Sequence, residues 1–407
     1  MKSVAKIRFA IPILLALLVP SLTYAQPYIQ TNLVSDLAAD APDLDQNLRN
    51  PWGLARSPGS PWWISDNNSG LNNTPGLATV YSIAGSISPA ITLAATTNAK
   101  LVVTIPPPNG SNSPASPTGM VWNGSSDFAL AAGKPAAFIF VTEDGTISGW
   151  NPGVDATHAI LEVDNSTSNA VYKGVTIGDV NGVRYLYVTN FRSGHVEVYD
   201  TNFKLVKFSP DKDDGDRDDH GKSEDKDHHD RGSFDDDAIP DGYAPFNVQN
   251  IGGSLFVTYA KQDAARHDDV AGAGNGYVDI YSTSGKLEAR LEHGSWLNSP
   301  WGVVWAPRDF GEFSNRVLVS NFGSGQIAAF DGFNGKFVGM VKAYTDPVAL
   351  TGEHVLMIDG LWALVFGNSG GAGPYNALFF TAGPNGESDG IFGALTPIAG
   401  EQDGDEE

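Results

Sequence analysis

Short apolar strands and polar turns follow one another along the chain in a repeating order. Each repeat opens with a short phrase around a small residue. About ten residues later, or rather more, an apolar strand ends in a polar residue, and a turn containing Gly or Asn leads into a third strand. The six openings are Asn50-Pro51-Trp52-Gly53-Leu54, Pro117-Thr118-Gly119-Met120-Val121, Tyr172-Lys173-Gly174-Val175, Ala244-Pro245-Phe246-Asn247-Val248, Ser299-Pro300-Trp301-Gly302-Val303 and Ile358-Asp359-Gly360-Leu361.

The spacing of these openings indicates the fold. Their central residues (Gly53, Gly119, Gly174, Asn247, Gly302 and Gly360) recur at intervals of 55 to 73 residues. Four short strands and their turns fit such a period, and repeats of this kind stack radially. The sequence therefore predicts an all-β protein, a six-bladed β-propeller of four-stranded blades. The sixth repeat lacks a clear fourth strand, so we expect the alternating segment 28–34 to supply it and to close the ring.

The two ends of the chain differ from the repeats. Residues 1–25 combine basic Lys2, Lys6 and Arg8 with an eleven-residue apolar run and small residues before Ala25, the pattern of a signal peptide. We expect an exported protein, extracellular or periplasmic, with no membrane span after cleavage. Its single propeller domain would cover 26–397, with an acidic disordered insert at about 209–241 and an acidic tail at 398–407.

Composition narrows the range of partners. The chain has no Cys and a net charge of −22, which disfavours binding to nucleic acid and to anionic membrane surfaces. Nearly four hundred residues can bury a large core without disulfides. We expect a monomer whose ligand is a protein, a glycan or a small molecule.

The Pro-x-Gly-Val/Leu openings resemble NHL-type repeats of six-bladed propellers. More closely, the Asn-Pro-Trp-Gly-Leu and Ser-Pro-Trp-Gly-Val phrases, together with the segment 261–276, resemble a family of exported bacterial propeller proteins of unknown activity. Some members of that family carry a PEP-CTERM sorting signal. The resemblance covers roughly residues 28–397 and implies a fold but no activity.

Strand order predicts which loops share a face. In a four-stranded blade, the loop between the second and third strands lies on the same side as the connection into the next blade. The Pro-Trp-Gly openings, the long loop 261–276 and the acidic insert should therefore share one face, where we expect function. The residues expected to bind a ligand there are Trp52, Trp301, Arg266, His267, Asp268 and Asp269.

The acidic insert offers one possible metal site. Residues 210–237 hold twelve Asp and one Glu against five Lys or Arg, with three His. Set against an EF-hand Ca²⁺ loop, the candidate ligands are Asp214, Asp216, Asp218 and Asp225, although Asp219 stands where that loop requires Gly. A solvated, disordered loop and transition-metal capture by His220, His228 and His229 are the alternatives.

A second possible metal site lies at the ends of the second strands. Propeller lactonases and lyases hold a central metal with Glu, Asp and Asn side chains. Here the corresponding candidates are Asp66, Glu143, Asn190 and Asn321, all of which also suit ordinary turns. Two functions therefore stay open, a non-catalytic binding scaffold and a Ca²⁺-dependent hydrolase or lyase acting on a small ester, lactone or sugar-derived substrate.

Overall fold

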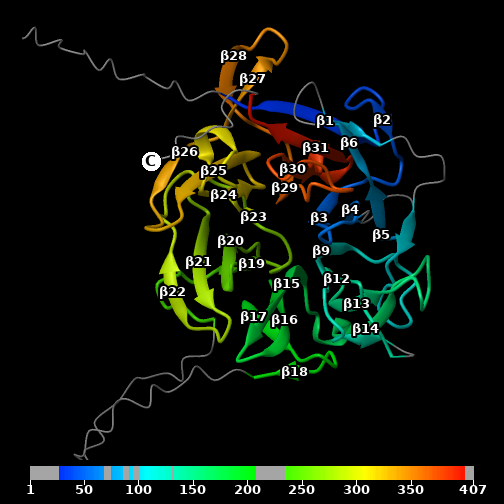
Figure 1. The fold of residues 1–407 in the computed structure, drawn as a ribbon. Coiled ribbons are helices and arrows are strands. Elements are labelled where there is room, and N and C mark those ends of the chain that lie inside the picture. Colours follow the sequence, from blue (N-terminus) through cyan, green and yellow to red (C-terminus); the bar gives the residue numbers. More distant parts are fainter. Residues whose placement is uncertain are drawn as a thin grey trace, which may run out of the picture.

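The chain forms six small antiparallel sheets arranged in a ring, as a computed structural model of residues 1–407 shows. The structure describes residues 27–67, 75–85, 91–94, 101–130, 133–207 and 234–398. The sheets follow one another in chain order around a common centre, and the first and last coloured segments adjoin (Figure 1). This is the predicted six-bladed β-propeller.

The first three blades are regular four-stranded sheets, each with its innermost strand first. Blade 1 consists of β3 (Pro51–Ala55), β4 (Trp62–Asp66), β5 (Leu77–Tyr81) and β8 (Val102–Thr104), with a side hairpin of β6 (Ile83–Gly85) and β7 (Ile91–Leu93). Blade 2 consists of β9 (Pro117–Trp122), β12 (Phe138–Thr142), β13 (Thr146–Trp150) and β14 (Ile160–Asp164), with a hairpin of β10 (Ala129–Leu130) and β11 (Lys134–Pro135). Blade 3 consists of β15 (Tyr172–Val180), β16 (Val183–Asn190), β17 (His195–Tyr199) and β18 (Leu205–Val206).

The last three blades complete the ring. Blade 4 consists of β19 (Tyr243–Ile251), β20 (Ser254–Lys261), β21 (Gly276–Ser282) and β22 (Leu287–Arg290). Blade 5 consists of β23 (Pro300–Trp305), β24 (Arg316–Asn321), β25 (Gln326–Asp331) and β26 (Phe337–Met340), followed by a hairpin of β27 (Lys342–Asp346) and β28 (Thr351–Val355). Blade 6 consists of β29 (Leu361–Phe366), β30 (Leu378–Ala382), β31 (Ile391–Thr396) and β1 (Ile29–Ser35), with β2 (Asp43–Leu44) at its edge. Three short helical turns complete the description: η1 (Ser166–Ser168), η2 (Gly311–Phe313) and α1 (Pro384–Glu387).

The N-terminal strand closes the ring as predicted. β1 pairs antiparallel with β31, from Ile29 opposite Thr396 to Ser35 opposite Ile391. The chain ends thereby share one sheet, and the last blade has no open edge where β31 would otherwise stand unpaired. No helix in the described part of the chain is both long and apolar enough to cross a membrane.

The hydrophobic core is divided among the gaps between neighbouring blades. Five clusters of buried side chains each fill one gap; for example, one joins Leu318 and Ala329 of blade 5 to Leu364 and Phe380 of blade 6. The sixth fills the gap between blades 6 and 1 and continues into the aromatic side chains around the axis. Fully burying one such large apolar side chain stabilises the fold by about 1.5–3 kcal/mol. Each sheet is thus held by its two neighbours, which is why the strands are apolar on both faces.

Small residues at the centre let the innermost strands meet. A Cβ placed on Gly53 would lie 2.6 Å from the carbonyl oxygen of Thr118, and one on Gly119 would lie 2.8 Å from the Cα of Gly174. The sixth copy of this position is not Gly360, as the opening phrases predict, but Ala363. A Cβ on Gly302 would contact the backbone on either side of Ala363, whereas Gly360 lies in the preceding turn with φ +66°. Alanine is also small enough to fill this position. A search for the repeated glycine therefore selects Gly360, three residues before the actual sixth copy.

The polar ends of the second strands join one blade to the next. The Thr381 hydroxyl donates to the carbonyl of Trp52 at 2.7 Å, and the Ser320 hydroxyl donates to the carbonyl of Trp362. Each bond runs from the second strand of one blade to the innermost strand of the following blade. These two hydroxyls therefore link neighbouring blades, whereas the Thr142 hydroxyl bonds to Thr146 of its own blade.

The end of the expected acidic insert, residues 234–241, packs against the propeller. Residues 208–233 lie outside the described part, but residues 234–241 are packed structure. Phe234 is buried and contacts Tyr187 and Tyr281, while Asp236 forms an ion pair with Arg290. Residues 234–241, the last part of the expected insert, therefore belong to the folded structure.

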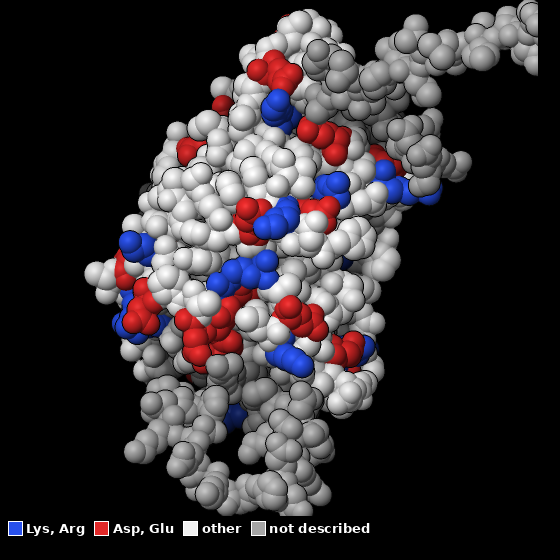
Figure 2. Space-filling view, turned by 90° about the vertical axis from the view of Figure 1, so that its left-hand side faces the viewer, with Lys and Arg blue, Asp and Glu red and all other residues white. Residues whose placement is uncertain are grey.

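The outer flank that includes β21, β22 and β26 carries acidic and basic groups side by side. Figure 2 shows red and blue side chains interspersed there, with no large area of a single sign. Such a flank is typical of an ordinary solvated surface. The unusual chemistry lies instead at the two ends of the central axis.

Candidate functional site

Aromatic side chains close the upper end of the axis, where the innermost strands begin. Trp52 stacks on Trp362 with ring centroids 3.5 Å apart, and Trp301 meets both edge-on at 6.1 and 6.0 Å. Phe322 stacks on the far side of Trp362 at 3.8 Å. The cavity left along the axis below them is about 20 Å³, the space of one water molecule. The axis is closed at its centre.

A lysine takes the place of an aromatic residue in blade 3. Lys173 of β15 occupies the position held by Trp52 in β3, Phe246 in β19 and Trp301 in β23, and its side chain is 1% exposed. Its ammonium nitrogen lies 5.0 Å from the ring centroid of Trp52 and 6.0 Å from that of Phe246. Cation–π attraction of this kind stabilises a desolvated ammonium by about 2 kcal/mol.

Two carboxylates neutralise this buried ammonium. Glu143, directly after β12, forms an ion pair with the Lys173 Nζ, and the Asp268 Oδ1 lies 3.5 Å from it. Burial by itself would lower the pKa of Lys173, but the ion pair and hydrogen bond with Glu143 outweigh it and raise that pKa. The lysine is therefore a permanent cation at the upper mouth. Asn67 holds the second oxygen of Glu143 by a hydrogen bond of 2.9 Å.

The long loop between β20 and β21 brings two further groups to the mouth. The Asp263 Oδ1 accepts the backbone N–H of His267 at 2.8 Å and that of Asp268 at 3.3 Å, which folds the loop tightly. Arg266 completes the turn with φ 54°. The His267 Nδ1 and the Asp268 Oδ1 are 2.8 Å apart, and this contact raises the pKa of His267 and lowers that of Asp268.

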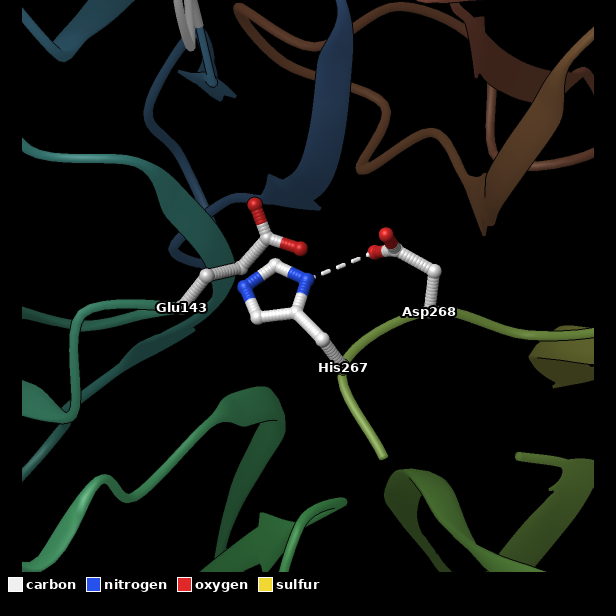
Figure 3. A group of neighbouring side chains, drawn as sticks. All are labelled: Glu143, His267 and Asp268. Atoms are coloured by element: carbon white, nitrogen blue, oxygen red, sulfur yellow. Dashed lines mark hydrogen bonds and ion pairs between the residues drawn. The ribbon is translucent and has the colours of Figure 1, made fainter. Parts of the chain in front are cut away.

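Three of these groups face one another closely enough to share an ion. Figure 3 shows Glu143, from the blade 2 side, opposite His267 and Asp268 of the loop. One ligand atom of each lies within 4.8 Å of the others. A set of one imidazole nitrogen and two carboxylates suits a borderline transition metal better than Ca²⁺, which prefers oxygen ligands alone.

A third carboxyl group, that of Glu387 in blade 6, lies near this cluster. Glu387 lies in the turn α1 between β30 and β31 and accepts a hydrogen bond of 2.8 Å from the Asn50 side chain. Burial, reinforced by the nearby charge of Glu143, raises the pKa of Glu387 to about 7. This carboxyl is about half protonated near neutral pH.

The structure thus groups the sequence-predicted residues in a different way. Of the four expected axial ligands, Glu143 alone lies in this cluster. Asp66 is wholly buried near Asp45, and burial raises its pKa well above the usual range. The Asn190 amide accepts the Ser193 N–H of its own turn and donates to the Glu197 Oε1 at 2.7 Å. The Asn321 amide donates to the Gln326 carbonyl and accepts the Asn298 N–H at 2.8 Å. Both asparagines are thus engaged by groups of the protein itself.

The predicted ligand-binding residues fall into two groups. Trp52 and Trp301 are only 2% and 4% exposed, so they form the floor of the site rather than its contact surface. His267, Asp268 and Arg266 lie on the accessible loop, and Asp269 beside them is half-buried, which raises its pKa. The insert candidates Asp214, Asp216, Asp218 and Asp225 lie outside the described residues.

Sequence reasoning missed Lys173 and Glu387 as site residues. Lys173 had a signal, because it is a charged residue at a position that is aromatic in most other repeats. Glu387 had none, since nothing in the phrase Pro384-Asn385-Gly386-Glu387 distinguishes it from a surface turn.

The resemblance to solved propeller structures is weak. An α-L-arabinofuranosidase of Fusarium graminearum in complex with arabinobiose is 9% identical with a TM-score of 0.47, covering 91% of this chain and 98% of that one. A gluconolactonase from Xanthomonas campestris is 13% identical with a TM-score of 0.41, covering 84% and 97%. The calcium-binding protein regucalcin from Agrobacterium tumefaciens is 10% identical with a TM-score of 0.39, covering 70% of this chain and 75% of that one. Likeness at this level is confined to the general fold.

Sequence relatives give a firmer result. No model of a known protein family matches the chain. The uncharacterized protein L690 of Acanthamoeba polyphaga mimivirus is 28% identical over 370 residues, covering 89% of this chain and 84% of that protein. The uncharacterized protein R648 of the same virus is 30% identical over 370 residues, covering 89% and 78%. Neither supports the expected exported bacterial family with its sorting signal. The chain belongs to the same family as the mimivirus protein R648.

Proposed function

We propose that this protein is an exported, non-catalytic binding scaffold. Its ligand, which is a protein, a glycan or a small molecule, is held at the upper mouth on the loop-rich face. The observation that carries this proposal is the buried ammonium of Lys173, which already neutralises the Glu143 carboxylate above an axis closed by tryptophan rings.

The position of Lys173 argues against a resident divalent metal at this mouth. A metal bound to Glu143 and Asp268 would lie within a few ångströms of the ammonium. At an effective dielectric constant of 20, two unit charges 4 Å apart repel by about 4 kcal/mol, and a dication doubles that figure. A metal would therefore have to displace the lysine from its aromatic surroundings. The ammonium of Lys173 already compensates the negative charge of Glu143 and Asp268, so these carboxylates need no metal.

The groups left for a ligand are those of the loop. The side chains of His267 and Asp268 are 43% and 66% exposed, whereas the Glu143 side chain beneath them is 10% exposed. A hydrogen-bonded imidazole and carboxylate offer both a donor and an acceptor to a polar partner. This supports recognition of hydroxyl or amide groups, as in a glycan or a peptide.

One observation favours a second function. The close approach of Glu143, His267 and Asp268 supports metal-dependent hydrolysis or elimination on a small ester, lactone or sugar-derived substrate. For the donor set of this cluster, Zn²⁺ or a similar metal is a better candidate than Ca²⁺. Ca²⁺ remains a candidate for the acidic insert.

Thermal unfolding with and without metal separates these functions. The full chain and a variant lacking residues 208–233 are melted in EDTA, in Ca²⁺ and in Zn²⁺. The scaffold predicts no stabilisation that survives the deletion. Stabilisation that survives the deletion but is lost in Glu143→Gln would instead establish a metal centre and favour the enzyme. The deletion stops before Phe234 because that residue is part of the core between blades 3 and 4.

Export and assembly are tested separately. Expression in a bacterial host followed by mass spectrometry of the secreted or periplasmic protein should find cleavage after Ala25, leaving Gln26 first. Retention of residues 1–25 in the cytoplasmic fraction would contradict export. Native mass spectrometry should find a monomer.

A further inference from the structure

A second cavity opens at the lower end of the axis, where the innermost strands end. Its volume is about 500 Å³, within the range of small-molecule sites. It lies opposite the Lys173 mouth, because the innermost strands run from the upper face to the lower one. The lining comes from five blades and includes Arg56, Trp122, Ile177, Gln249, Asn250 and Val365.

Of the two arginines that line this cavity, Arg56 has no counter-ion among the described residues. Arg56, directly after β3, donates from Nε to the Phe366 carbonyl at 2.6 Å and from Nη2 to the Gly367 carbonyl at 2.9 Å. Its guanidinium lies 5.8 Å from the ring centroid of Trp62. Across the described ranges, no carboxylate forms an ion pair with it, and burial is the one influence on its pKa, which it lowers.

Arg184 shows the usual arrangement in the same cavity. Its guanidinium lies 2.8 Å from the Asp127 Oδ2 and 3.5 Å from the Asp179 Oδ1. Arg184 is therefore neutralised by the protein, whereas Arg56 is not. A partly buried charge without a partner is costly, and a guanidinium has five N–H donors of which Arg56 uses two on carbonyls. The other three donors bond to no group among the described residues, and Arg56 is part of the cavity lining.

The surroundings of Arg56 specify more of the ligand. Trp122, Ile177 and Val365 provide apolar wall, and Gln249 contributes an amide that bonds to no other group in the described chain. A guanidinium binds a carboxylate through paired N–H donors, while the tryptophan and aliphatic side chains favour an apolar body.

We propose that the lower mouth binds a small organic carboxylate, with its carboxylate on Arg56 and its apolar body against Trp122, Ile177 and Val365. This site is separate from the upper mouth and does not rest on the function proposed there. The charge of Arg56 sets the preference for an anion, and the cavity volume limits the body to about the size of one or two rings.

The probe for this site is benzoate, with benzamide as its neutral counterpart. Isothermal titration calorimetry or saturation-transfer NMR on the full chain should find that benzoate binds and benzamide binds at least about tenfold more weakly. Equal binding of the two, or no binding of benzoate, would overturn the proposal. This comparison needs no variant.

Variants then locate the binding. Arg56→Met should weaken benzoate binding at least about tenfold, and Arg56→Lys should retain part of it. Arg316→Met is the matched control, because Arg316 forms its ion pair with Asp331 in blade 5, outside this lining. Undiminished binding in Arg56→Met would contradict the assignment.

A filling variant covers the case in which Arg56→Met does not fold. Gln249→Trp keeps Arg56 and places a large ring in the cavity, so benzoate binding should be lost while circular dichroism stays unchanged. Benzoate binding that persists in a folded Gln249→Trp variant would place the ligand elsewhere and refute the site.

Discussion

Replacing Lys173 with Met tests the account of the upper mouth most severely. Met has a similar length and no charge, so the substitution leaves the aromatic surroundings filled and removes the ammonium alone. Glu143 would then be a nearly buried carboxylate without a counter-ion, with Asp268 3.5 Å from the former position of the ammonium. Removing one partner of a buried ion pair costs about 3–5 kcal/mol.

The assay is equilibrium unfolding in guanidinium chloride, followed by tryptophan fluorescence. Lys173→Met should lower the free energy of unfolding by about 3–5 kcal/mol at neutral pH. The matched control is Lys342→Met. Lys342 forms an ion pair of 2.6 Å with Glu353, but its side chain is 42% exposed, so the expected loss is below about 1 kcal/mol.

A gain of metal binding should accompany the loss of stability. Without the ammonium, the ligand atoms of Glu143, His267 and Asp268 are free to hold a dication. With residues 208–233 deleted from both chains, Zn²⁺ should therefore stabilise Lys173→Met and leave the unsubstituted chain unchanged. If Lys173→Met is no less stable than Lys342→Met, or if Zn²⁺ stabilises both chains equally, the reasoning about the built-in cation is refuted.

Three further substitutions test neighbouring parts of the account. The raised pKa of Glu387 means that the folded state binds the extra proton, so the native chain should lose up to about 3–4 kcal/mol of stability as the pH rises from 4.5 through about 7. This loss should disappear in Glu387→Gln, and an unchanged pH dependence of unfolding would contradict the prediction. Asp268→Asn should lower the pKa of His267 toward 6.5 in an NMR titration, since the Asp268 contact is the main cause that raises it, and an unmoved titration would show that the contact is absent in solution. Gly53→Ala should destabilise the propeller by about 1–3 kcal/mol, because its Cβ would lie 2.6 Å from the Thr118 oxygen. Gly59→Ala is the control and should not destabilise it, since no atom lies within 4 Å of that Cβ. Equal unfolding midpoints for the two variants would argue against close contact of the inner strands.

The fold was predictable because each blade repeats the same local constraint. Each repeat has a small residue at the axis, an apolar second strand and a hydroxyl near the end of that strand. These features depend on contacts within one blade and with its neighbour. The Thr381 and Ser320 bonds to the next blade, and the close approach at Gly53 and Gly119, are the physical content of that repeat. The role of 28–34 in closing the ring followed because a ring leaves one strand position to fill.

The site was only partly predictable because it is built from single departures from the repeat. His267 and Asp268 stood out in a long loop and do lie at the mouth. The charge that organises them, Lys173, comes from another blade, and its meaning depends on Glu143 facing it across the axis. Asparagine suits a metal site as well as a turn, so the bonds that Asn190 and Asn321 make within the protein could not be predicted from the sequence.

The lower cavity carried no sequence signal at all. Arg56 is unusual because no carboxylate pairs with it in the described chain, and pairing depends on which residues are neighbours in three dimensions. Arg184, with the same side chain and the same cavity, differs only because Asp127 and Asp179 lie beside it.

Direct observation of the Lys173 ammonium by ¹⁵N NMR would test the central claim about the upper mouth. A chain labelled at lysine Nζ, with the signal assigned through Lys173→Arg, should give a slowly exchanging ammonium resonance at neutral pH. That resonance should be the same in EDTA, in Ca²⁺ and in Zn²⁺, because the cation is already in place. A Lys173 resonance that is lost or shifted when either metal is added would show that the metal displaces the lysine, and it would turn the upper mouth from a scaffold into a metal centre.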